Sequence, residues 1–253
     1  MIWLALAALA LLAALAVLLY RERHRTAGLR AQLEVLAAEL QRLQQACARL
    51  APAGLVQRLA SEGAESSAER KIVTALFADL VGYTALSEKL DAPVLARLLN
   101  GYFQRAADAI TNNRGHVSTF LGDGILAYFG ALEPNPWQCN DAARAALAMR
   151  DAMRAYSSEL EREGLPRLAV GIGIHRGPGL AGLMGSRDRI EYSVIGRTVN
   201  LAARVQALTR SHNVDILLTG SVREQLDPRF ALKAMPPLPV KGIAEPVVTY
   251  ALE

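Results

Sequence analysis

From Arg70 to the end of the chain, short apolar runs alternate with longer stretches of helical periodicity, which limits the fold to the α/β and α+β classes. The run KIVTALFA (71–78) has the length and composition of a buried strand, and a helix is expected over about 85–112. HVSTFLG and ILAYFG then read as the two strands of a hairpin. The remaining expected elements are a helix over about 138–163, strands at RLAVGIGIH and IEYSVIG, a helix over about 198–209, and strands at VDILLT and VVTYAL.

A run of apolar residues, 2–19, precedes this region and contains no polar side chain. Its length is enough for a helix to cross a bilayer. Tyr20 and the basic stretch RERHR (21–25) follow it. By the positive-inside rule they predict a single-pass helix over 1–20 in the inner (plasma) membrane, with the rest of the chain in the cytoplasm. A cleaved signal peptide is the alternative, but no basic segment precedes the run and no polar cleavage region follows it.

Between the apolar run and the domain, apolar side chains recur at alternating spacings of four and three. These positions are Leu29, Leu33, Leu36, Leu40, Leu43, Cys47 and Leu50. Such a heptad seam predicts a coiled-coil connector over 26–52 that pairs two chains, and an amphipathic helix packed on its own domain is the alternative. Pro52 ends this helix, so 53–69 is interpreted as a linker and 70–253 as the main domain.

Charge and cysteine content exclude several classes of partner and cofactor. The formal net charge is only +4, and no Lys/Arg block is interleaved with aromatic residues, so no nucleic-acid partner is predicted. Cys47 and Cys139 lie far apart and form no CxxC motif, which argues against a disulfide framework and against a zinc site. A reducing, cytosolic setting fits this composition best.

Two aspartates stand beside glycines where predicted strands end. Asp79 closes the apolar run of the first strand, and Asp123 lies between two glycines at the hairpin tip. Carboxylates so placed suit a hard cation such as Mg²⁺, although from local sequence alone helix capping by Asp79 and the turn preference of Asp123 account for them better. Asn200 and Arg204 are four residues apart on a predicted helix, so they share a face that suits a sugar and a phosphate, or simply solvent.

Four motifs occur in one order between residues 70 and 252: FADLVGYT, FLGDGILAYFG, YSVIGRTVNLAAR and LPVKGIAEPV. Together they resemble the catalytic domain of class III nucleotidyl cyclases, the adenylate and guanylate cyclase family. The resemblance implies an α/β (α+β) fold with a ferredoxin-like βαββαβ core and additions. It also implies an adenylate cyclase-type phosphorus–oxygen lyase that converts a nucleoside triphosphate, ATP first, into the 3′,5′-cyclic nucleotide and pyrophosphate.

The resemblance carries specific roles over to matching positions. It implies that Asp79, Asp123 and the carbonyl of Leu80 bind two ions, Mg²⁺ or Mn²⁺. Asn200 would position the ribose, and Arg204 would stabilise charge on the α-phosphate in the transition state. In similar enzymes two domains pair head to tail, so a homodimer is implied in which one chain supplies the aspartates of each site and its partner supplies the Asn/Arg pair.

Three further positions concern the ends of the nucleotide. Lys241 matches the lysine that contacts the terminal phosphates. Thr119 and Ser193 occupy the base-reading positions, where adenylate cyclases usually have Lys with Asp or Thr and guanylate cyclases Glu with Cys. ATP, GTP and the pyrimidine nucleotides therefore stay open as substrates. A catalytically silent, nucleotide-binding signalling module is the alternative from another class, and the joint presence of the metal, ribose and phosphate residues argues against it. His175 is interpreted as a structural histidine.

Overall fold

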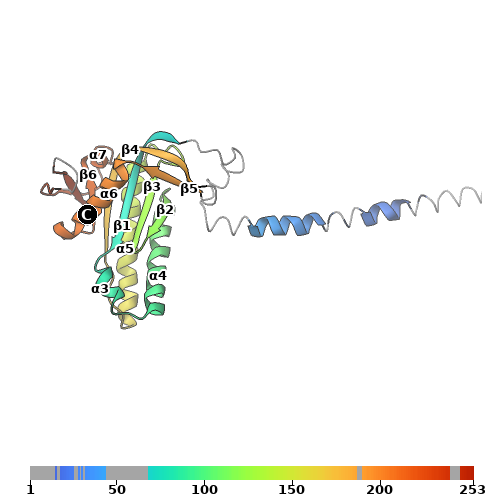
Figure 1. The fold of residues 1–253 in the computed structure, drawn as a ribbon, viewed down its shortest axis with the longest axis horizontal. Coiled ribbons are helices and arrows are strands. Elements are labelled where there is room, and N and C mark those ends of the chain that lie inside the picture. The colour runs from blue at the N-terminus through green and yellow to red at the C-terminus, as the bar shows by residue number, and fades with distance from the viewer. Residues whose placement is uncertain are drawn as a thin grey trace, which may run out of the picture. The chain divides into compact units, whose positions relative to one another are not determined.

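The computed structural model describes residues 15, 18–25, 28, 30, 32–43, 68–186, 190–239 and 246–253. The chain divides into two compact units, Met1–Ser61 and Glu62–Glu253. The second unit contains all the strands described, and its sheet and helices are labelled in Figure 1.

In the first unit, residues 18–25 and 32–43 are helical. Among the described residues, no helix is long and apolar enough to cross a membrane. The described residues 18–25 include the charged stretch RERHR. The expectation of a single-pass helix over 1–20, and of a location in the inner membrane, is thus corrected. Most of the apolar run itself lies outside the described residues.

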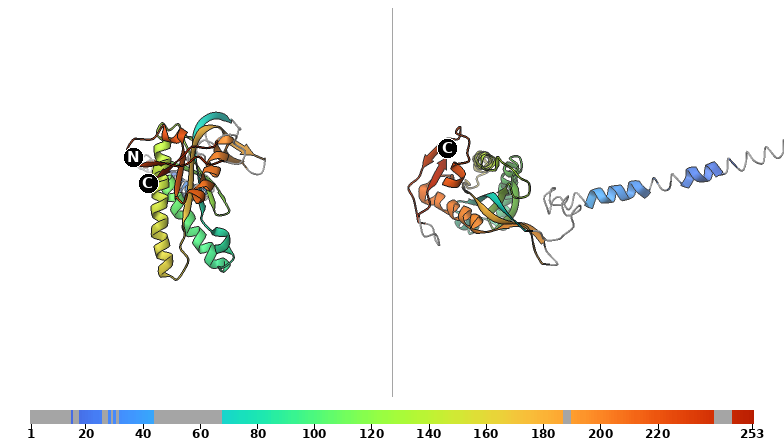
Figure 2. Two further views of the ribbon diagram at one scale, coloured as in Figure 1. Left: turned by 90° about the vertical axis from the view of Figure 1, so that its left-hand side faces the viewer. Right: turned by 90° about the horizontal axis from the view of Figure 1, so that it is seen from above.

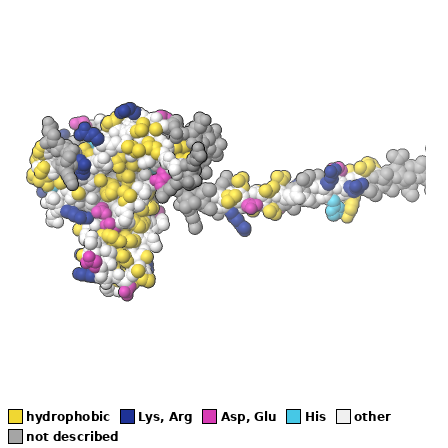
Figure 3. All heavy atoms as spheres, viewed as in Figure 1, with side chains coloured by type: hydrophobic (Ala, Val, Ile, Leu, Met, Phe, Trp, Pro, Cys, Tyr) yellow, Lys and Arg dark blue, Asp and Glu magenta, His cyan; other side chains and the backbone are white. Residues whose placement is uncertain are grey.

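The described helix 32–43 carries four of the predicted seam positions. Leu33, Leu36, Leu40 and Leu43 are all exposed, with 57 to 65 % of their surface accessible. Figure 3 shows hydrophobic side chains spread along this helix. The other seam positions lie outside the described residues. The coiled coil stays a prediction.

One eight-stranded mixed sheet forms the centre of the second unit. Its strands are β1 (Glu69–Leu80), β2 (His116–Leu121), β3 (Gly124–Phe129), β4 (Val170–Gly185), β5 (Ile190–Ile195), β6 (Ile216–Thr219), β7 (Leu232–Ala234) and β8 (Thr249–Leu252). The order in the sheet is β2-β3-β1-β4-β6-β8-β7, with β5 paired to β4. The pairs among β2, β3, β1 and β4 are antiparallel, whereas β4 and β6 run parallel.

The helices are α3 (Tyr83–Ser87), α4 (Ala92–Thr111), α5 (Gln138–Arg162), α6 (Arg197–His212) and α7 (Gly220–Arg223). The succession β1, α4, β2, β3, α5, β4 confirms the expected βαββαβ order. The single helix expected over 85–112 is wrong, because it is divided into α3 and α4. Asp91 has an extended backbone, with φ −61° and ψ 142°, and Pro93 lies in the first turn of α4. Proline lacks the N–H that a continuous helix needs at this point. The short elements β7 and α7 were not expected from periodicity.

The two faces of the sheet have different partners. The side chains of Leu76, Ala78 and Leu80 enter the main core, which also contains the buried sides of α4 and α5. These two helices lie side by side (Figures 1 and 2). Successive side chains of a strand point to opposite faces, so Asp79 points away from this core. The register places Asp79 opposite Gly171 of β4, where α6 packs against the sheet.

Glycines on β4 allow α6 to lie directly on the sheet. A Cβ atom at Gly173 would be 2.2 Å from the backbone nitrogen of Gln206 and 2.5 Å from the backbone oxygen of Ala202. Because both atoms belong to the helix backbone, no side-chain movement relieves the clash. Gly173 therefore sets the distance between α6 and the strand, and with it the position of the side chains that α6 carries.

We expect Gly173→Ala to lower the free energy of unfolding by about 1–3 kcal/mol, because α6 must shift to accommodate the methyl group. Gly220→Ala is the matched control, since a Cβ atom at Gly220 meets nothing within 4 Å. Urea unfolding of both variants measures the difference. Equal stability of Gly173→Ala and the wild type would contradict this account of the packing.

Candidate active site

The first part of the candidate site lies where β1 ends. Asp79 and Leu80 are the last two residues of β1, and Asp123 lies in the tight turn between β2 and β3. Gly122 in this turn has φ 64°, a left-handed conformation that glycine adopts without strain. Because Ala78 pairs with Ile125, the turn lies at the end of β1, where Asp123 is close enough to Asp79 to affect its ionisation.

The surroundings of Asp79 favour its protonated form. Burial, the hydrogen bond with Asp123 and the negative charge of Asp123 raise the pKa of Asp79 to about 6, against the opposing effect of Arg210. Two neighbouring carboxylates repel each other when both are ionised. A cation between them removes that repulsion, so the pair has the electrostatics of a cation site.

The oxygens available here fit a hard divalent cation. The guanidinium of Arg210 donates from Nη2 to Asp79 Oδ2 at 3.1 Å and to the Leu80 carbonyl oxygen at 3.4 Å. The carboxylate and the carbonyl therefore point at one cationic group. Carboxylate and carbonyl oxygens are ligands that Mg²⁺ accepts, together with water and substrate phosphates. Among the described residues, no three or more His, Cys, Asp or Glu side chains lie close enough together to hold a metal ion by themselves.

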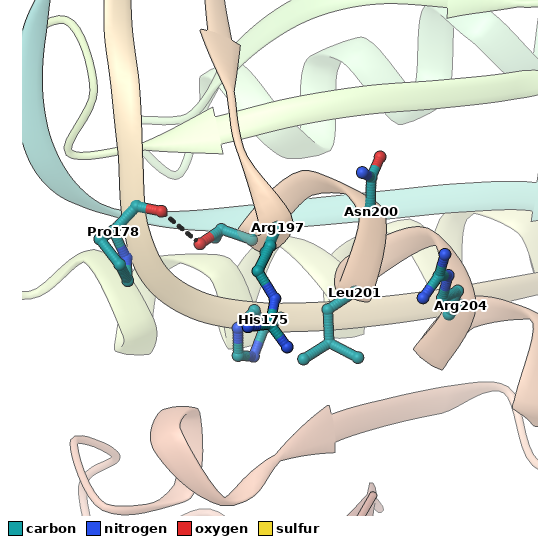
Figure 4. Close-up of a pocket in the computed structure, with 7 residues that line it drawn as sticks. His175, Pro178, Arg197, Asn200, Leu201 and Arg204 are labelled. Atoms are coloured by element: carbon teal, nitrogen blue, oxygen red, sulfur yellow. Dashed lines mark hydrogen bonds between the residues drawn. The ribbon is translucent and has the colours of Figure 1, made fainter. Parts of the chain in front are cut away.

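The second part of the candidate site is a cavity of about 400 Å³ at the beginning of α6. Its lining residues are His175, Pro178, Arg197, Thr198, Asn200, Leu201 and Arg204. Figure 4 shows Asn200 and Arg204 projecting from α6 beside this cavity, while Arg197 extends toward His175. The hydroxyl of Thr198 donates to the Pro178 carbonyl at 2.7 Å and ties the first turn of α6 to β4. An amide and guanidinium groups thus line a space suited to a polar, anionic ligand.

The two parts lie at different ends of α6 within one chain. Ten residues separate Asn200 from Arg210, the residue that contacts Asp79, and this corresponds to about 15 Å along a helix. Neither aspartate lines the cavity. The structure therefore brings Asp79, Leu80 and Asp123 together, and separately Asn200 and Arg204, but it does not join the two groups.

His175 lines the cavity yet is held by neighbours within the fold. Its Nδ1 atom lies 2.8 Å from the Thr219 hydroxyl and 3.3 Å from the Ser221 hydroxyl. Burial lowers the pKa of His175 to about 4, so the ring is neutral near pH 7. These contacts support the interpretation of His175 as a structural residue.

Burial also lowers the pKa of His116 to about 4, from an ordinary value of 6.5 for both histidines. Between these values the unfolded chain binds protons that the folded chain does not, so stability is lost as the pH falls from about 6.5 toward 4. We expect the double variant His116→Gln/His175→Gln to lose less stability than the wild type between about pH 7 and pH 4.5, by roughly 2–4 kcal/mol. Urea unfolding across this range measures the slope, and parallel slopes would contradict the expectation.

The residues expected at the base lie on two strands. Thr119, on β2, is half-buried, and its hydroxyl makes a long contact of 3.4 Å with the Phe120 carbonyl. Ser193, on β5, pairs in register with Gly182 of β4. The Tyr128 hydroxyl of β3 donates to the carbonyl oxygen of Val194, the neighbour of Ser193, at 3.3 Å. Lys241, expected at the terminal phosphates, lies outside the described residues.

Comparison with known proteins assigns this arrangement to a family. The family model for the adenylate and guanylate cyclase catalytic domain matches residues 65–253. The chain belongs to this cyclase family. An adenylate cyclase of Anabaena cylindrica is 32% identical over 234 residues, which cover 88% of this chain and 46% of that protein. Adenylate cyclase 1 of Rhizobium meliloti is 28% identical over 176 residues, covering 70% of this chain and 26% of that protein. The cyclase thus spans less than half the length of these relatives.

Solved structures of cyclases share its fold. The adenylyl cyclase CyaB from P. aeruginosa superimposes with a TM-score of 0.69 at 27% identity, covering 74% of this chain and 96% of that chain. The guanylyl cyclase Cya2 superimposes with a TM-score of 0.66 at 32% identity, covering 73% of this chain and 93% of that chain. Both confirm the mixed α/β fold expected of a cyclase domain. Because one is named for each purine base, overall similarity does not distinguish adenine from guanine.

Two residues of the cyclase domain were not singled out from the sequence. Arg210 reaches Asp79 across 131 positions of the chain, and no local pattern signals such a contact. Arg197 lines the same cavity as Asn200 and Arg204. The sequence could have indicated Arg197, because residues 197, 200 or 201, and 204 are three, four and seven positions apart and so share one face of a helix.

Proposed function

We propose that this cyclase domain converts a nucleoside triphosphate, ATP in preference, into the 3′,5′-cyclic nucleotide and pyrophosphate. The observation that supports the proposal is the antiparallel pairing of β1 with β3, because it brings the turn that contains Asp123 to the end of β1, where Asp79 and the Leu80 carbonyl lie. The Anabaena cylindrica adenylate cyclase, 32% identical, supports adenine as the base.

In this reaction the ribose 3′-oxygen attacks the α-phosphorus and loses its proton to water. The bond from the α-phosphorus to the oxygen that bridges to the β-phosphorus breaks, and pyrophosphate leaves with the bonding electrons. Two divalent cations, Mg²⁺ or Mn²⁺, held by Asp79, Asp123 and the Leu80 carbonyl, would supply the Lewis acidity for both events. Asn200 holds the ribose, and Arg204 donates to the α-phosphate oxygens as their charge grows.

The separation of the two residue groups supports a shared site in a homodimer. Within one chain the Asn200 and Arg204 cavity does not include the aspartates. A second copy placed head to tail brings its own Asn/Arg pair to the aspartates of the first. The exposed leucine stripe of helix 32–43 offers an additional surface for pairing two chains, because exposed leucines at heptad spacing favour association.

The direct test is incubation of the full chain with ATP, GTP, CTP and UTP separately, each with Mg²⁺ and with Mn²⁺, and identification of the products by mass. The proposal requires a cyclic nucleotide and pyrophosphate in equal amounts, with ATP turned over fastest. Binding of nucleotide without any cyclic product would favour a silent nucleotide-binding module instead.

Base choice is expected to be loose. Thr119 and Ser193 are short hydroxyls that each donate or accept, so a wrong base leaves fewer buried groups unpaired than it would opposite Lys or Glu. We expect Thr119→Lys to raise the preference for ATP over GTP about tenfold, equivalent to about 1.4 kcal/mol for one added charge-assisted hydrogen bond.

Thr111→Lys provides the control, because it adds the same charge at an exposed position of α4 whose hydroxyl bonds only to its own helix. The measurement is cyclisation of ATP and GTP separately and in competition. Should the wild type already reject GTP by several orders of magnitude, Thr119 and Ser193 do not make the choice.

A further inference from the structure

One guanidinium occupies the place where the proposed cation would bind. Arg210, near the end of α6, donates to Asp79 Oδ2 at 3.1 Å and to the Leu80 carbonyl oxygen at 3.4 Å. These are the atoms of two of the three groups assigned to the metal. Mg²⁺ binds such oxygens at about 2.1 Å, so it takes the position from which the guanidinium hydrogen bonds now come.

The Arg210 guanidinium and a divalent cation compete for the same place, because both are positively charged. The guanidinium of Arg210 brings a positive charge to the Asp79 carboxylate. A divalent cation that enters beside it meets that charge and competes for the same lone pairs. The pair Asp79 and Asp123 attracts either cation, because two close carboxylates are stabilised by any positive charge between them.

The exposure of the two side chains allows an exchange. The Arg210 side chain is 53% exposed, whereas the Asp79 side chain is 23% exposed. The guanidinium can therefore swing into solvent and recover its hydration, while the carboxylate stays in place at the end of β1. The helix need not move for this exchange, because a long arginine side chain reorients about its own bonds.

We infer that Arg210 occupies the metal site in the absence of the cation, bonded to the Asp79 carboxylate and the Leu80 carbonyl, and is displaced when the divalent cation binds. The inference rests on the metal site of the proposed function. It assigns to Arg210 an effect of defined sign: the chain binds Mn²⁺ more weakly with Arg210 present than without it. A residue that merely kept the ligands in shape would have the opposite effect, because its loss would weaken metal binding.

The experiment measures Mn²⁺ binding to the full chain without nucleotide, by the loss of the free-ion signal in electron paramagnetic resonance. We expect Arg210→Gln to bind Mn²⁺ about two- to fivefold more tightly than the wild type, the range expected for breaking a partly exposed ion pair. Arg210→Lys keeps the charge and is expected to bind nearly as weakly as the wild type. Arg154→Gln is the matched control, since it removes an arginine of another partly exposed ion pair, with Asp215 at 2.9 Å.

The outcomes separate this inference from the proposed function. Asp79→Ala and Asp123→Ala must each weaken Mn²⁺ binding strongly; if they do not, the metal site itself is misplaced and the inference falls with it. If they do, but Arg210→Gln binds Mn²⁺ equally or more weakly than the wild type, the metal site stands and the displacement of Arg210 is refuted. An equal gain in Arg154→Gln would also refute it, because the effect would then be one of net charge.

Discussion

Asp79→Ala is expected to lower the rate of cyclisation by at least about a thousandfold, because it removes a charged ligand from a site that must hold a doubly charged ion. Asp123→Ala is expected to do the same. We expect the loss of activity to come from the missing metal ligand and not from unfolding of the chain. Burial and the neighbouring carboxylate raise the pKa of Asp79, so its ionised form is disfavoured in the folded chain, and its removal should leave the stability unchanged or higher.

Asp151→Ala is the control for the loss of an aspartate. Asp151 lies on α5, its side chain is 64% exposed, and it pairs with the adjacent Arg150. Its replacement should leave the rate within about twofold of the wild type, as is usual for exposed surface positions. The measurements are the initial rate of cyclic-nucleotide formation and the urea midpoint of each variant. A rate near that of the wild type in Asp79→Ala or Asp123→Ala would contradict a mechanism in which both carboxylates bind the metal ions.

Features encoded over a few residues could be predicted from the sequence. The buried run that ends at Asp79 and the glycine-flanked turn at Asp123 are local patterns, and both formed as β1 and the β2–β3 hairpin. The helix that bears Asn200 and Arg204 likewise follows from apolar periodicity. That the two aspartates lie at the same end of the sheet was implied only by the family resemblance, because it depends on β1 and β3 being neighbours in the sheet.

Features that depend on distant parts of the chain could not be predicted. The contact of Arg210 with Asp79 requires α6 to lie on β4, which the glycines at 171 and 173 permit.

The break between α3 and α4 could have been predicted from the sequence. Asp91 and Pro93 are signals of a helix start, but the apolar periodicity around them favoured one continuous helix. The membrane helix was predicted from the length of the apolar run and from the aromatic and basic residues that follow it, and among the residues described no helix is long and apolar enough to cross a membrane.

The shared site predicts that two inactive variants restore each other. Asp79→Ala lacks a metal ligand, and Arg204→Ala lacks the donor to the α-phosphate, so each homodimer has two defective sites. In a mixed dimer one site receives both defects, and the other receives intact aspartates from one chain and an intact Asn/Arg pair from its partner. Random exchange makes half of the dimers mixed, and each has one good site of two, so about a quarter of the wild-type activity should return.

The measurement that tests this account most directly is the rate of cyclic AMP formation in an equimolar mixture of Asp79→Ala and Arg204→Ala chains, after exchange of subunits. Differently tagged chains recovered together establish that exchange has occurred. The account predicts activity well above the sum of the two separate variants, approaching about one quarter of the wild-type rate. A mixture of exchanged subunits that stays as inactive as its components would contradict a site built from the aspartates of one chain and the Asn200 and Arg204 pair of its partner.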